Sequence, residues 1–171
     1  MIRPAAFPLA LFLASSLLAA VPLTHAAELT TVAERSAFER TGRYEEVIQL
    51  CADFAARYPK AVRCIDFGRT PEGRPMKALV VSTSGALSAQ AAQAQKLPVV
   101  LIQGGIHAGE IDGKDAGLLA IREVLERRAA PGALDRQVLL FVPVFNIDGH
   151  ERFRRWNRPN QRGPVEMGWR T

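Results

Sequence analysis

The stretch PVVLIQGGIHAGEIDG, residues 98–113, decides the fold of this chain. Its first part, residues 98–105, is an apolar run that ends in two glycines, and it predicts a strand covered on both faces. Helix-forming residues with an apolar stripe follow over 112–128, and QVLLFVPVF, residues 137–145, is a second apolar run. The order strand, helix, strand predicts a βαβ unit with a parallel pair inside a larger sheet, and hence an α/β fold.

The segment upstream of this unit predicts a helix and a hairpin. Residues 44–58, YEEVIQLCADFAARY, carry apolar side chains at helical spacing and stop before a proline. Two short strands are expected over residues 61–68 and 75–83, because the turn-forming stretch RTPEGR lies between them. Residues 84–96 are small and polar, and they predict either a loop or a loosely held helix.

The first 26 residues have the form of a secretory signal peptide. Arg3 provides a short positive region, residues 5–21 are an apolar run, and small residues then lead to a cleavage site near Ala26. An uncleaved membrane anchor is the alternative, but the run is short for a spanning helix. The sequence therefore predicts an exported protein, periplasmic or secreted, with no stable membrane insertion after cleavage and with an N-terminal extension over residues 27–43.

The net charge bears on possible binding partners, and the two cysteines bear on a possible disulfide. The formal net charge is +5, which is mildly basic, and export would place the chain where nucleic acid is scarce, so no nucleic-acid partner is expected. Cys51 and Cys64 are the two cysteines. They would pair as a disulfide in an oxidising compartment, or they are two small buried thiols, and the sequence leaves both readings open.

Polar residues follow both strands of the predicted parallel pair, and ligands bind α/β sheets at the carboxyl ends of such strands. The first loop carries His107 and Glu110. An imidazole and a carboxylate three residues apart can both reach one zinc ion, and a catalytic zinc site takes three protein ligands and a water. In the alternative reading, His107 only fills the turn.

The second loop is rich in arginine. A guanidinium group binds carboxylates through paired hydrogen bonds and can stabilise a developing oxyanion. A solvated charged loop and a phosphate-binding patch are the alternatives. The arginines of this stretch are Arg152, Arg154, Arg155, Arg158 and Arg162.

Three blocks, GIHAGEIDGKDAG, FNIDGHERF and RWNRPNQRGPVEMGWRT, occur in this order. Together they resemble the zinc metallocarboxypeptidases, the carboxypeptidase A-like peptidases, from about Tyr44 to the end of the chain. The resemblance implies a mixed β-sheet flanked by helices, a zinc cofactor, and hydrolysis of the C-terminal peptide bond of a peptide substrate.

The resemblance also implies roles for individual residues. His107 and Glu110 match the first two zinc ligands. The block NIDG, residues 146–149, matches a turn that positions the loop, with isoleucine where the family has proline. Arg158 is the arginine expected to polarise the scissile carbonyl and hold the oxyanion, and Arg155 is the reserve for that role and a second substrate-binding residue.

Some family features have no match in these 171 residues. These are a third zinc ligand, which is a histidine, a glutamate general base, and an Asn–Arg pair that grips the substrate carboxylate. His150 is expected to be a loop residue and not the third ligand. Residues 44–171 therefore resemble the N-terminal half of a catalytic domain. Two further hypotheses are a zinc amidase or deacylase of the same fold and a catalytically inert truncated product.

Overall fold

The computed structural model describes residues 29–154, and these form a mixed sheet of four strands in the order β1-β2-β4-β3. Strand β1 (Val62–Arg69) pairs antiparallel with β2 (Pro75–Val81), which pairs antiparallel with β4 (Val138–Val142). Strand β3 (Val99–Gln103) lies parallel to β4. The predicted hairpin, parallel pair and α/β class are thus confirmed, whereas the predicted signal peptide and residues 155–171 lie outside the described residues.

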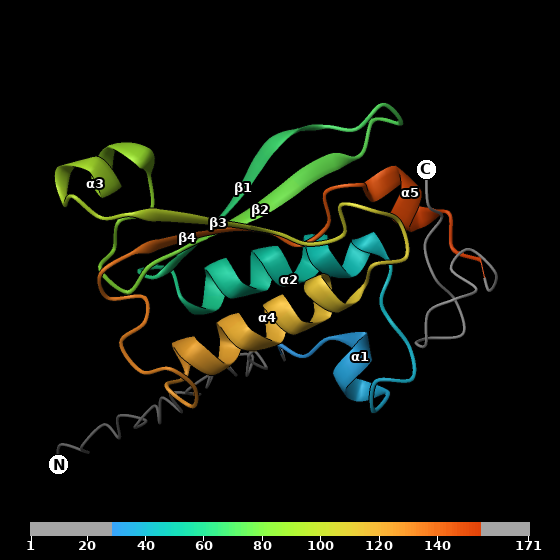
Figure 1. Cartoon of the computed structure of the whole chain (residues 1–171), viewed down its shortest axis with the longest axis horizontal. Helices are drawn as coiled ribbons and strands as arrows, with labels where there is room; N and C mark the ends of the chain where they lie inside the picture. Colours follow the sequence, from blue (N-terminus) through green and yellow to red (C-terminus); the bar gives the residue numbers. More distant parts are fainter. Residues whose placement is uncertain (1–28, 155–171) are drawn as a thin grey trace, which may run out of the picture.

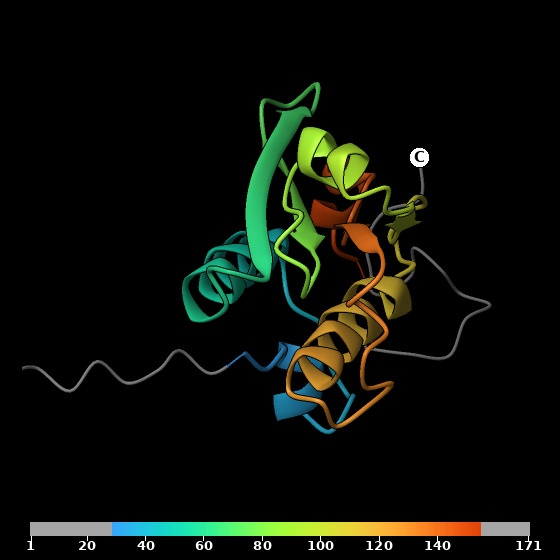
Figure 2. The same cartoon turned by 90° about the vertical axis from the view of Figure 1, so that its left-hand side faces the viewer.

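Helices flank this sheet. Figure 1 shows α2 (Tyr44–Arg57) and α4 (Asp112–Leu125) side by side along one face, with α1 (Val32–Arg35) below them. The short α3 (Ala89–Ala94) lies on the opposite side, as the turned view in Figure 2 also shows, so the helical reading of this segment holds for six of its residues. Helix α5 (Ile147–Glu151) follows β4. No helix among residues 29–154 has the length and apolar character needed to cross a membrane.

Alternating side chains of the sheet build a core on each face. Leu79 and Phe141 belong to the cluster under α2 and α4, where they pack with Phe54 and Leu118. Neighbouring residues in the same strands point the other way and pack against α3; they are Val80, Val138 and Leu140. The two-residue period of the strands therefore explains why β2 and β4 are apolar on both faces.

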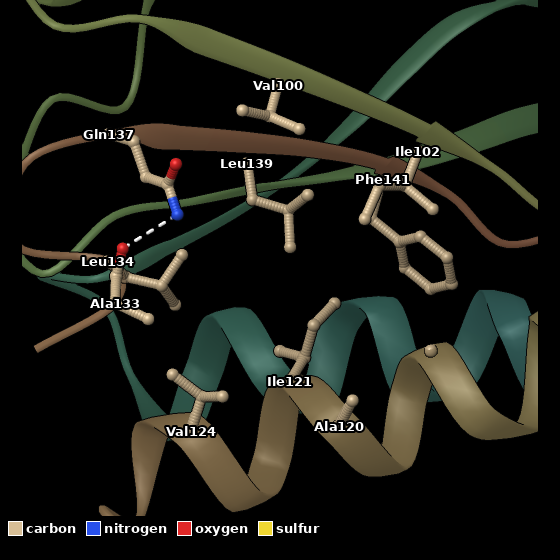
Figure 3. A pocket seen from close by; sticks show the side chains of 11 residues that line it. Val100, Ile102, Ala120, Ile121, Val124, Ala133, Leu134, Gln137, Leu139 and Phe141 are labelled. Carbon is tan, nitrogen blue, oxygen red and sulfur yellow. Dashed lines mark hydrogen bonds between the residues drawn. The ribbon is translucent and has the colours of Figure 1, made fainter. Parts of the chain in front are cut away.

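The prediction that the strand after Pro98 is covered on both faces is wrong for the described part of the chain. Val99 is 55% exposed and Leu101 54%, and the other residues of β3 are exposed as well. Strand β3 is an edge strand here, paired with β4 alone. On its α4 side, Val100 and Ile102 line an apolar groove of about 220 Å³ (Figure 3). An apolar run signals a strand that needs cover, but it does not say which residues supply the cover.

The two cysteines form a disulfide, which resolves the alternative that the sequence left open. Cys51 of α2 is bonded to Cys64 of β1, with their Cα atoms 5.3 Å apart. Cys51 is fully buried in the core cluster under the sheet. The bond therefore joins the helix to the outer strand of the hairpin.

Removing this bond is expected to lower the free energy of unfolding by about 3 kcal/mol, because the cross-link closes a short loop and restricts the unfolded chain. The loop spans a sequence separation of 13 residues. Urea unfolding of the oxidised protein and of a Cys51→Ala/Cys64→Ala variant measures the loss. Unfolding of the reduced wild-type protein is the control, and equal stability before and after reduction would contradict the expectation.

Candidate metal centre

Backbone hydrogen bonds join the two loops that leave the parallel strands. The amide of Gly104 donates to the carbonyl of Val142 at 2.8 Å, and the amide of Phe145 donates back to the Gly104 carbonyl at 2.9 Å. The next pair follows the same pattern, with the amide of Asn146 2.9 Å from the carbonyl of Gly105. The two predicted polar loops therefore lie at one edge of the sheet, as parallel strands require.

Gly104 sits where backbones approach too closely for a side chain. A Cβ atom at this position would lie 2.5 Å from the carbonyl oxygen of Pro143 and 3.1 Å from the carbonyl carbon of Gly113 in α4. Further along, Gly109 has a φ of 79°, a conformation that L-residues with side chains rarely adopt. These two glycines let the loop turn sharply between β3 and α4, and they place the residues between them at the sheet edge.

His107 and Glu110 face each other in this loop. Nδ1 of His107 lies 3.0 Å from Oε1 of Glu110, and the backbone amide of His107 donates to Oε2 at 3.3 Å. Both side chains are accessible, with 46% of the His107 side chain and 34% of the Glu110 side chain exposed. The structure therefore brings the two predicted metal ligands together at an open edge.

The spacing of this pair fits a zinc ion. In a tetrahedral site with bonds of about 2.0–2.2 Å, two ligand atoms lie about 3.3 Å apart. The 3.0 Å between Nδ1 and Oε1 is close to that value, so a small opening of the pair would admit the metal. Imidazole nitrogen and carboxylate oxygen are also donors that zinc accepts. Within residues 29–154, no cluster of three or more candidate ligands exists, so the pair supplies two ligands and the described chain offers no third.

Asp148 ties the loop after β4 to the tip of the β1–β2 hairpin. Its carboxylate accepts hydrogen bonds from the Thr70 hydroxyl at 2.8 Å and the Glu72 amide at 3.1 Å, and it pairs with Arg74 at 2.5 Å. Burial alone would raise the pKa of Asp148, but these donors outweigh it and hold the pKa below its ordinary value.

The predicted positioning turn at residues 146–149 is therefore an anchor between two parts of the sheet edge. The side chain of Asn146 caps α5 by accepting from the amide of Gly149 at 3.0 Å. The sequence pattern marked the turn but not its partner, because the hairpin tip lies more than 70 residues away along the chain.

A buried charge cluster that was not predicted from the sequence joins α2 to the first turn of α4. We define it as Glu46, Lys114 and Asp115. Nζ of the fully buried Lys114 donates to Glu46 at 2.8 Å and to Asp115 at 2.6 Å. Burial raises the pKa of Asp115 even though Lys114 and the hydroxyl of Thr41 favour its charged form. One signal was available, because Lys114 falls four residues before Leu118 on the apolar stripe of the helix, where a charge needs a partner.

Within residues 29–154, His150 and Arg152 have other partners than the His107–Glu110 pair. His150 was expected in a loop, but it lies buried in helix α5, where its Nε2 is 3.2 Å from the carbonyl of Gly42. Arg155 and Arg158 lie outside the described residues. Arg152 instead pairs with Glu72 at 2.6 Å, on the hairpin tip.

The chain is similar in sequence to known proteins. A sequence model described as zinc carboxypeptidase matches residues 47–167. Carboxypeptidase B of Helicoverpa zea is 29% identical over 129 residues, which cover 71% of this chain and 29% of that protein. The inactive metallocarboxypeptidase ECM14 of Saccharomyces cerevisiae is 33% identical, over 72% of this chain and 30% of its own length.

The fold is also similar to that of a solved structure. The crystal structure of carboxypeptidase A from Helicoverpa armigera superposes with a TM-score of 0.56 and 28% identity, over 66% of this chain and 26% of that one. The chain thus spans about 30% of the length of the curated relatives that it matches. The family match covers well over half of the chain and includes both predicted metal ligands. The chain belongs to the zinc carboxypeptidase family.

Proposed function

We propose that this chain carries part of the active site of an exported zinc metallocarboxypeptidase, which hydrolyses the C-terminal peptide bond of peptide substrates. The observation that supports this most directly is the convergence of His107 and Glu110 within 3.0 Å at the carboxyl edge of the parallel strands. Bound zinc would polarise the scissile carbonyl and lower the pKa of a water. His107 and Glu110 would hold the metal, and the loop after β4, which Asp148 ties to the hairpin, lies beside the loop that carries them.

Arg158 is proposed to bind the substrate and hold the oxyanion, with Arg155 as a second substrate-binding residue. The support is the match to the family pattern, which extends through this segment to residue 167. In the full-length protein, Arg158→Ala is expected to lower kcat by about 10²–10³, the usual effect of removing one oxyanion donor. Arg155→Ala is the comparison. A loss seen only in Arg155→Ala would move the role to Arg155.

Export is proposed from the N-terminal pattern and is supported by the disulfide. A buried cystine between α2 and β1 suits an oxidising compartment, where such bonds persist. The proposed arrangement of the chain is a signal peptide over residues 1–26, an N-terminal extension over 27–43 and the N-terminal half of the catalytic domain over 44–171.

Replacing His107 with alanine is expected to abolish zinc retention, because the pair would lose its nitrogen ligand. Metal content after dialysis and the titration of zinc or Co²⁺ into the purified full-length protein measure the effect. His150→Gln is the matched control, since this buried histidine lies against Gly42 and should leave metal binding unchanged. Unchanged metal content in His107→Ala would contradict the assignment of His107 as a zinc ligand.

A catalytically inert product is the second candidate, and two observations favour it. Residues 29–154 offer only two converging metal ligands, and one relative is named an inactive metallocarboxypeptidase. Weak zinc binding without peptidase turnover is the result expected of the 171-residue chain alone. Stoichiometric, tightly bound zinc together with peptidase turnover would contradict the hypothesis of an inert product. Activity on acyl-amino acids, and not on blocked dipeptides, would favour the amidase or deacylase.

A further inference from the structure

Residues 29–43, which we call the N-terminal strap, are built into the domain and do not lie loosely on it. Leu29 is 4% exposed and belongs to the same core cluster as Leu118 and Ile121 of α4. Its carbonyl accepts a hydrogen bond from the guanidinium of Arg122 at 2.7 Å. The start of the strap is therefore fixed to the last turns of α4.

The middle of the strap is fixed by a second contact with Arg122. The guanidinium, whose side chain is only 10% exposed, also pairs with the carboxylate of Glu34. Glu34 in turn closes a capping box with Thr31, whose hydroxyl accepts from the Glu34 amide at 3.1 Å and whose amide donates to the carboxylate at 3.0 Å. Removal of the strap would take away the Leu29 carbonyl and the Glu34 carboxylate and leave Glu123 as the remaining ion-pair partner of Arg122 in the described structure.

The end of the strap reaches the charge cluster next to the metal loop. The hydroxyl of Thr41, which is 8% exposed, donates to Asp115 at 2.7 Å. The Asp115 amide bonds to the carbonyl of Ile111 at 3.1 Å, which is the residue directly after Glu110. Thr41 therefore contacts a residue in the first turn of α4, and that helix begins two residues after Glu110.

We propose that the N-terminal strap is a permanent part of the mature domain and that Thr41 acts through Asp115 as a positioning residue for Glu110. The strap is therefore not an activation segment that is removed between residues 29 and 43. The positioning role rests on the proposed zinc site, whereas retention of the strap does not.

Limited proteolysis of the purified full chain tests retention. Trypsin has targets in the strap at Arg35, Arg40 and Arg43, and the Arg35 side chain is 50% exposed. Cleavage at these sites is expected to be no faster than global unfolding, because the strap must leave the core before its backbone fits the protease. The loss of ellipticity measures the rate of global unfolding. Rapid cleavage that leaves a folded remainder with unchanged zinc affinity would overturn the proposal.

Zinc affinity of strap variants tests positioning. Thr41→Val keeps the shape of the side chain but removes the hydroxyl donor, and it is expected to weaken zinc binding by about tenfold, the low end of effects from outer contacts of metal sites. Thr41→Ser should restore the affinity, because it returns the hydroxyl. Ser36→Ala is the matched control, since this hydroxyl bonds only within the strap, to Ala33 and Arg40.

The outcomes separate this inference from the proposed function. If His107→Ala leaves zinc binding unchanged, the zinc site itself is wrong. If His107→Ala abolishes zinc binding while Thr41→Val behaves like Ser36→Ala, the zinc site stands and the positioning role fails. Melting temperatures of the same variants show whether a loss of affinity follows a general loss of stability, because a structural role alone would lower both in proportion.

Discussion

Lys114→Met is expected to lower the free energy of unfolding by about 3–5 kcal/mol, because it breaks a buried ion pair by removing one partner. Lys114 is fully buried, and its ammonium group is the only strong donor that the described structure places between the carboxylates of Glu46 and Asp115. Without it, two acids with little solvent access face each other. Domains of this size have a total stability of about 5–15 kcal/mol, so the loss is a large part of the whole.

Chemical denaturation at two pH values measures this effect. The difference in stability between wild type and variant should narrow as the pH falls, because protonation neutralises the Asp115 carboxylate, which has lost its cation. Lys77→Met is the control, since its Nζ pairs with Asp66 at 2.7 Å where the Asp66 side chain is 58% exposed, and such pairs contribute at most about 1 kcal/mol. Equal losses in the two variants would show that the buried cluster is no more important than a surface ion pair.

The second large effect is a loss of stability on acidification that depends on His150. Burial lowers the pKa of this histidine from 6.5 to about 4, helped by the positive charges of Lys114 and Arg43. Between these two values the unfolded chain binds the proton and the folded chain does not, so stability falls as the pH drops from 6.5 to 4. At 1.36 kcal/mol per unit, the histidine accounts for roughly 3 kcal/mol of this fall.

The comparison of wild type with His150→Gln isolates that contribution. Glutamine keeps a donor for the carbonyl of Gly42 but does not titrate. Other groups also titrate in acid, such as Asp148 and Glu34, whose pKa values are held low, but they are common to both proteins. The difference in unfolding free energy between wild type and variant should therefore change by roughly 3 kcal/mol from pH 7 to pH 4. Parallel pH profiles would contradict the burial argument.

The parts of the fold that follow from local pattern were predictable. Period-two and apolar runs predicted the hairpin and the parallel pair, and parallel pairing then placed His107 and Glu110 beside the loop that carries Asn146. The geometry of the pair itself depends on residues three apart in one turn, so it needed no distant partner. These elements are encoded by residues close together in sequence, so they could be predicted.

Contacts between distant segments were not predictable from pattern. The apolar composition of β3 predicted cover on both faces, but composition does not reveal that the described residues leave Val99 and Leu101 exposed. Asp148 was expected only to shape a turn, although its carboxylate bonds to a hairpin 78 residues away. The sequence alone could not distinguish a disulfide from two free thiols, because only the packing of α2 against β1 brings Cys51 and Cys64 together.

The N-terminal strap has a consequence for the order in which the chain folds. The carbonyl of Leu29 accepts a hydrogen bond from Arg122, 93 residues later, so closing this contact brings together two distant parts of the chain. The capping box of the strap joins residues three apart, so that turn can form at once, while docking must follow the completion of α4. The first described segment of the chain is thus among the last to be fixed, and Leu29 stays exposed until α4 has formed.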